Sequence, residues 1–196
     1  MKIILASLIA SAAAFAPSKV AQTSTSLKAF EDAIGAQEPL GFWDPLGMLD
    51  GADQERFDRL RYVELKHGRI AMLAVAGHIH TTMGYHFPGL DGIPTGWAGT
   101  TQVPMTVALQ TLATVAVLEL FVMKDVKGTG ETPGDFRNGF DFGWDKFTPE
   151  EKREKLSIEL NNGRAAQMGI LGLMVHEQIN GNPYVINELL GYHVSV

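Results

Sequence analysis

The chain has 196 residues, a formal net charge of −6 and a mean hydropathy of +0.03. This length allows one domain, and the hydropathy lies between that of soluble proteins and that of multi-span membrane proteins. The acidic balance argues against a nucleic-acid partner, and the absence of cysteine excludes disulfides and thiolate metal sites.

The first 27 residues have the composition of a targeting sequence. Lys2 precedes an apolar run from Ile3 to Ala14, which is typical of a secretory signal and too short for the roughly 20 residues of a membrane span. Residues 17–27 contain Ser, Thr and Lys but no acid, as in an organelle transit peptide. We therefore expect a bipartite presequence over residues 1–27 and one folded domain over residues 28–196.

Three segments of the folded domain are apolar enough to be buried helices. They comprise residues 69–85, 103–123 and 164–175. The middle segment has 21 residues, with Gln110 and Glu119 as its strongly polar side chains, and it has the length of a transmembrane helix. The other two reach that length only if each includes the charged residues that precede it.

Lys and Arg alternate between the loops in the pattern of a membrane protein. Six lie in residues 28–69 and eight in residues 124–164, whereas residues 86–103 and 177–196 have none. Positive residues collect on one side of a membrane, and a soluble bundle has no reason to sort them. We predict an all-α membrane protein of three transmembrane helices, with the N-terminus and the second loop on the same side.

A ten-residue repeat precedes the first and third apolar segments. Residues 64–73 and 159–168 share five identities, which include a Glu, a Gly and an Arg. The repeat extends upstream, since residues 41–47 and 141–145 both combine aromatic residues with Asp and Gly. These two stretches suit turns at a membrane interface, either as simple anchors or as ligand contacts.

The repeated charges must be paired inside a membrane. Each unpaired Glu or Arg costs about 2.5–3.5 kcal/mol at a helix centre. Glu64 and Arg69 lie roughly 140° apart around one helix, which is unsuitable for pairing within it. We therefore predict that the first and third helices cross about a pseudo-two-fold axis, with Glu64 against Arg164 and Arg69 against Glu159. The Gly of each repeat would allow the close approach.

Two stripes of potential metal ligands follow the same helices. Each begins with the repeated Glu and continues along one face: Glu64, His67 and His78 in the first, and Glu159, Asn162 and His176 in the second. A stripe of roughly 20 Å is too extended for one metal. A magnesium tetrapyrrole needs a single axial ligand, and Glu, Asn, Gln and His can all supply one. Hydrogen bonding between the helices is the alternative role for these side chains.

The motif E-x-x-[HN]-x-R, present as Glu64, His67 and Arg69 and again as Glu159, Asn162 and Arg164, resembles the light-harvesting chlorophyll-binding family. The presequence Ala-Ala-Ala-Phe-Ala-Pro, the stretch Phe-Trp-Asp-Pro-Leu-Gly and the short C-terminal tail are most similar to fucoxanthin chlorophyll a/c proteins of diatoms. The resemblance implies three transmembrane helices, the first and third crossed, that hold chlorophyll a, chlorophyll c and fucoxanthin, with diadinoxanthin as a further candidate.

The resemblance also implies roles for individual residues. Axial ligands to chlorophyll magnesium would be Glu64, His67, Glu159, Asn162, His176 and Gln110, with Arg69 and Arg164 as charge partners. Glu119 is the other candidate on the second helix, but it lies on the opposite face from Gln110, and His78 has suitable geometry without a family counterpart. The first carotenoid site would involve Trp43, Asp44, Pro45 and Leu46, and the second would lie around residues 141–144.

A member of this family would be an antenna without enzymatic activity. It would lie in the plastid thylakoid membrane with its N-terminus in the stroma. It would pass excitation to photosystem I or II together with other antenna subunits, as a homo- or hetero-oligomer. A photoprotective relative would share every motif.

Two rivals from other classes are weaker. A di-iron carboxylate enzyme would use Glu64 and His67, but the second copy has Asn162 where such an enzyme needs His. A transporter would usually have helices broken near the membrane midplane, whereas no Pro interrupts residues 64–85 or 159–178.

Overall fold

A computed structural model describes residues 30–123, 131–137 and 140–181. In chain order the elements are α3 (Gln54–Thr82), α4 (Trp97–Thr100), α5 (Met105–Val117), the π-helical turn η1 (Leu118–Val122), the 3-10 turn η2 (Trp144–Lys146) and α6 (Pro149–Asn180). Within these ranges the protein is helical, as predicted. The expected presequence and the C-terminal tail lie outside the described residues.

The two repeat helices are longer than their apolar segments. α3 begins after Asp53, whose side chain accepts a hydrogen bond from the Arg56 backbone N–H. α6 begins with a capping box in which Thr148 and Glu151 each bond the other's backbone N–H. α6 ends at Gly181, in the left-handed conformation. Because capping residues are polar, the apolar segments of the sequence begin several residues after the two helices do.

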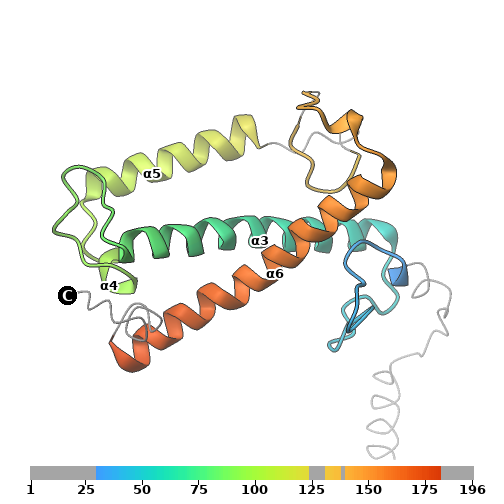
Figure 1. Ribbon diagram of the computed structural model, residues 1–196, viewed down its shortest axis with the longest axis horizontal. Helices are drawn as coiled ribbons and strands as arrows, with labels where there is room; N and C mark the ends of the chain where they lie inside the picture. Colours follow the sequence, from blue (N-terminus) through green and yellow to red (C-terminus); the bar gives the residue numbers. More distant parts are fainter. Residues whose placement is uncertain (1–29, 124–130, 138–139, 182–196) are drawn as a thin grey trace, which may run out of the picture.

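α3 and α6 cross each other, as Figure 1 shows, and pack closely around two glycines. A Cβ atom built on Gly68 would lie 2.9 Å from the Cα atom of Gly163. Ala71 and Leu160 are among the few buried apolar side chains of the described residues. The predicted crossing at the repeat glycines is therefore confirmed.

α5 packs closely against neither of the other long helices within the described chain. None of its residues is buried. Its link to α3 is an ion pair between the Lys66 ammonium and Glu119, which lies in η1. Most of the apolar surface of α5 is thus open to whatever surrounds the protein.

Among the described helices, one continuous stretch is long and apolar enough to cross a membrane by length and composition. It covers Met105–Val122, which is the middle segment predicted from the sequence. α3 and α6 do not meet that criterion, because each carries the ionised residues of its repeat and a polar N-terminal portion.

The loop between α3 and α5 is held by a carboxylate from α6. Glu177 is 8% exposed, and its two carboxylate oxygens lie 2.7 and 2.8 Å from the Trp97 backbone nitrogen. It also accepts from the Ala98 backbone N–H at 3.2 Å. These bonds satisfy the free N–H groups at the start of α4. From its glycines alone, the stretch of residues 84–99 is expected to be a loop without regular structure. That expectation is wrong at the C-terminal end of the stretch, where α4 begins.

Replacing Glu177 with Gln should destabilise the protein by about 1–3 kcal/mol, because the amide removes the negative charge from these hydrogen bonds and places an NH2 donor against the Trp97 backbone N–H. The measurement is thermal unfolding by circular dichroism in mild detergent. Gln178→Ala, at the exposed neighbouring position, is the control. Equal melting temperatures for the two variants would contradict the assigned role of Glu177.

Replacing Gly68 with Ala should lower stability by about 1–3 kcal/mol, because the added methyl group meets the backbone of Gly163 and forces α3 away from α6. Gly77→Ala, on the same helix with no heavy atom within 4 Å of the new methyl group, should be neutral or stabilising. The helix-crossing interpretation fails if both variants unfold at the same temperature.

Candidate functional site

Two ion pairs join α3 and α6 across their crossing. Arg164 Nε lies 2.7 Å from Glu64 Oε1, and Arg69 Nε lies 2.6 Å from Glu159 Oε1. All four side chains are between 28% and 41% exposed. This is the cross-repeat pairing predicted from the helical spacing, and each pair brings together opposite charges from the two helices.

The same arginines also hold the loops that precede the helices. Arg164 Nη1 donates to the Gly35 carbonyl at 2.9 Å, and Arg69 Nη1 donates to the Gly134 carbonyl at 2.7 Å. Both glycines have a positive φ, +114° and +82° respectively, which is a backbone conformation that residues with a side chain rarely adopt. The correspondence between the two repeats therefore extends from the helices into their flanking loops.

His67 is placed as a metal ligand would be. Its Nδ1 lies 2.8 Å from the Val63 carbonyl oxygen, which can only accept. In a neutral imidazole this contact places the proton on Nδ1 and leaves the lone pair of Nε2 available. His67 is exposed on α3, and Asn162 is exposed at the matching position of α6. Both side chains thus face outward from the crossing, where a bound group could reach them.

The other predicted ligands have varied surroundings. His176 on α6 and Gln110 on α5 are exposed, whereas Glu119 is engaged with Lys66. His78 differs, because its Nε2 is buried without a hydrogen-bond partner and its Nδ1 lies 3.4 Å from Thr82 Oγ1. The buried Nε2 of His78 is therefore less accessible to a metal than the exposed side chain of His67.

A groove of about 720 Å³ lies on one side of the crossing. Its wall includes the stretch Trp43, Asp44, Pro45 and Leu46, and its floor includes the ion pair of Glu64 and Arg164. The carboxylate of Asp44 accepts from the backbone N–H groups of residues 48 and 49 at 3.0 and 2.8 Å. Asp44 therefore shapes the loop, while the side chains of Trp43 and Leu46, 68% and 81% exposed, supply apolar surface.

A second groove, of about 370 Å³, lies on the Arg69 and Glu159 pair. Phe142 and Trp144 line it, from the stretch that the sequence relates to residues 41–47. Each of the two loops thus lines a groove on one of the two ion pairs.

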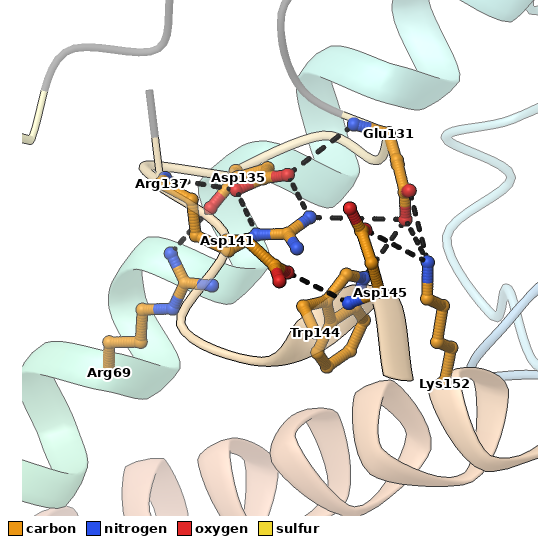
Figure 2. A network of polar contacts seen from close by, with 9 residues as sticks. Arg69, Glu131, Asp135, Arg137, Asp141, Trp144, Asp145 and Lys152 are labelled. Atoms are coloured by element: carbon orange, nitrogen blue, oxygen red, sulfur yellow. Dashed lines mark hydrogen bonds and ion pairs between the residues drawn. The ribbon is translucent and has the colours of Figure 1, made fainter. Parts of the chain in front are cut away.

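A polar network fixes the loop of the second groove, as Figure 2 shows. Arg137 Nε donates to Asp135 at 2.9 Å, Trp144 Nε1 donates to Glu131 at 2.9 Å, and Lys152 of α6 donates to Glu131 at 3.1 Å. The Arg137 guanidinium also lies 4.8 Å from the centre of the Trp144 ring. Sequence reasoning did not find this network, because its acids and bases resemble ordinary surface charges until the fold gathers them.

Residues 30–178 match the family model described as chlorophyll a-b binding protein. The chain belongs to this family. It is 58% identical to a fucoxanthin-chlorophyll a-c binding protein, chloroplastic, of Trieres chinensis, over 96% of this chain and 100% of that protein. It is 56% identical to fucoxanthin-chlorophyll a-c binding protein B of Phaeodactylum tricornutum, over 91% and 96% of the two chains. The fucoxanthin-chlorophyll a-c binding protein B, chloroplastic, of Macrocystis pyrifera is 54% identical over 83% of this chain.

Membership of the chlorophyll a-b binding family confirms the resemblance drawn from the repeated motif. The matched range contains both ion pairs, both grooves and every predicted ligand. It also covers the loop network of Figure 2, which the motif itself does not include.

The carboxylate of Asp135 should stabilise the fold fully at every pH well above its ordinary pKa. Hydrogen bonds from Arg137 lower the pKa of Asp135 from 3.8 to about 2. A carboxylate whose pKa is lower in the folded than in the unfolded protein stabilises the fold fully above its unfolded-state pKa. This stabilisation is lost as the pH falls through the folded-state pKa. Asp135→Asn should therefore cost about 1–2 kcal/mol equally at pH 5 and pH 7. Thermal melts at both pH values test this, with the exposed Asp91→Asn as control, and a cost that disappears at pH 5 would contradict it.

Proposed function

We propose that the protein is a light-harvesting antenna that binds chlorophyll a, chlorophyll c and fucoxanthin. The observation that carries the proposal is the paired arrangement at the helix crossing. There, charge-neutralised glutamates stand beside an outward His67 and an outward Asn162. The names of the relatives give the pigment classes.

The residues of the crossing fit the needs of chlorophyll. The macrocycle supplies four nitrogens to magnesium, so the protein must add one axial oxygen or imidazole nitrogen. We assign this role to Glu64, His67, Glu159, Asn162, His176 and Gln110, with Arg69 and Arg164 as charge partners. Glu119 and His78 rank below these six, because the first is paired with Lys66 and the second is covered.

The two grooves suit carotenoids. A long apolar polyene with polar ends matches an apolar groove that ends on an ion pair and on backbone groups of a loop. We place one carotenoid against residues 43–46 and another against residues 141–144. Fucoxanthin is the first candidate and diadinoxanthin the second.

The exposed apolar surface supports a membrane location. The core of the described residues is limited to Phe30, Ala52, Ala71 and Leu160, while Leu73, Leu120 and Phe121 are more than 60% exposed. Water would disfavour such a surface, whereas lipid and pigment would cover it. We infer three transmembrane spans in the thylakoid of a plastid, with the N-terminus in the stroma and residues 1–27 as the targeting sequence.

The antenna role follows from holding many pigments close together. The protein sets position, axial ligation and local polarity, and the pigments absorb and transfer the excitation. The final acceptor would be photosystem I or II, reached through other antenna subunits in a homo- or hetero-oligomer. A photoprotective role remains the second candidate, since the same pigment cluster could dissipate excitation.

Asn162→Leu should remove about one chlorophyll per protein and leave the others, because Leu offers no axial oxygen. The measurement is the chlorophyll-to-protein ratio of the chain refolded with an extract of chlorophyll a, chlorophyll c and fucoxanthin. Gln178→Leu, which replaces another exposed amide on the same helix, is the matched control and should keep every chlorophyll. Equal ratios in both variants would refute Asn162 as a ligand, and a colourless refolded chain would refute the antenna proposal.

A further inference from the structure

The two repeat glutamates are not equivalent. Glu64 is held by two guanidinium groups, since Arg164 Nε contacts Oε1 at 2.7 Å and Arg61 Nη1 contacts Oε2 at 2.6 Å. Within the described residues, Glu159 is paired with Arg69 alone, through Oε1 at 2.6 Å. Both oxygens of Glu64 are therefore occupied by cations, whereas Oε2 of Glu159 is not.

The sequence explains this difference at one position. Arg61 lies three residues before Glu64, and the residue three before Glu159 is Leu156. The repeat is thus broken at the residue that could reach the second carboxylate oxygen. The charges of the first group, one Glu and two Arg, sum to +1, while the Glu and Arg of the second sum to zero.

Arg61 is held firmly in place. Its side chain is 14% exposed, and its guanidinium carbon lies 5.2 Å from the centre of the Phe57 ring. Gly35 leaves room for it, because a Cβ atom there would lie 2.7 Å from Arg61 Nη1. A charge that is largely shielded from water acts on its neighbours more strongly than an exposed one.

We propose that Arg61 makes the two glutamate sites electrostatically unequal, so that the chlorophyll on Glu64 and the chlorophyll on Glu159 have different transition energies. A carboxylate shared between two guanidiniums donates less charge to magnesium than one with a single partner. A net positive charge beside one macrocycle also shifts the energy of its optical transition. Arg61 is thus a tuning residue that acts through Glu64, and this inference rests on the proposed function.

The test is the low-temperature absorption spectrum of the Arg61→Leu variant, refolded and loaded with pigment. Leu is chosen because it is the residue at the matching position 156 of the second repeat. We expect the red chlorophyll band to show a difference signal equal in area to one chlorophyll, with the pigment-to-protein ratio unchanged. Arg61→Lys should largely restore the spectrum, because the charge is kept. Arg59→Leu, which removes an exposed charge from the same helix, should leave the spectrum unchanged.

Other outcomes would overturn the proposal. A spectrum of Arg61→Leu that superimposes on that of the unmodified protein removes the tuning role. Arg61→Gln is a second neutral variant, with a side chain longer than that of Leu. If it and Arg61→Leu both fail to load pigment while Arg61→Lys loads it, the positive charge at position 61 serves folding instead. Glu64→Leu distinguishes a failure of the ligand assignment at Glu64 from a failure of the tuning role of Arg61. If it keeps every chlorophyll, the ligand assignment at Glu64 fails, and if it loses one while Arg61→Leu shifts nothing, the tuning alone fails.

Discussion

The crossing of α3 and α6 is the constraint on which the described structure depends. Two glycines let the helix backbones meet, and two Glu–Arg pairs neutralise charges that an apolar environment would otherwise exclude. Each arginine then binds the carbonyl of a loop glycine, Gly35 or Gly134, so the same pair that joins the helices also positions a groove wall. Helix packing, loop placement and the candidate ligand positions thus share one set of contacts.

Little apolar surface is buried between the protein's own elements. The closest contacts are polar pairs and a glycine crossing, while α5 and the outer faces of α3 and α6 leave large apolar side chains open. In the proposed function this exposed apolar surface is what lipid and pigments would cover. Such a surface agrees with a scaffold whose purpose is to hold pigments, because an apolar surface closed on itself would leave them no room.

The two repeats match at the Glu–Arg ion pairs and differ in the residues around those pairs. One loop is held by the carboxylate of Asp44, and the other by the network of Glu131, Asp135 and Arg137. Arg61 has no counterpart in the second half, and the buried carboxylate of Glu177 fixes α4 at the opposite end of α6. The two proposed pigment sites would therefore differ in their surroundings, although α3 and α6 present the same Glu–Arg pairing.

The sequence by itself determined the helical class, the repeat, the pairing of Glu64 with Arg164 and of Arg69 with Glu159, and the family. These follow from helical periodicity and from the cost of an unpaired charge, which are local and leave few solutions. Only the tertiary structure decided that His78 is covered, that Glu119 is engaged by Lys66, and that Glu177 starts α4 inside a loop expected to be irregular. It alone also gathered the loop network around Asp135. Such contacts depend on which side chains the crossing brings within hydrogen-bond distance, and spacing along one helix carries no information about the partner that arrives from another.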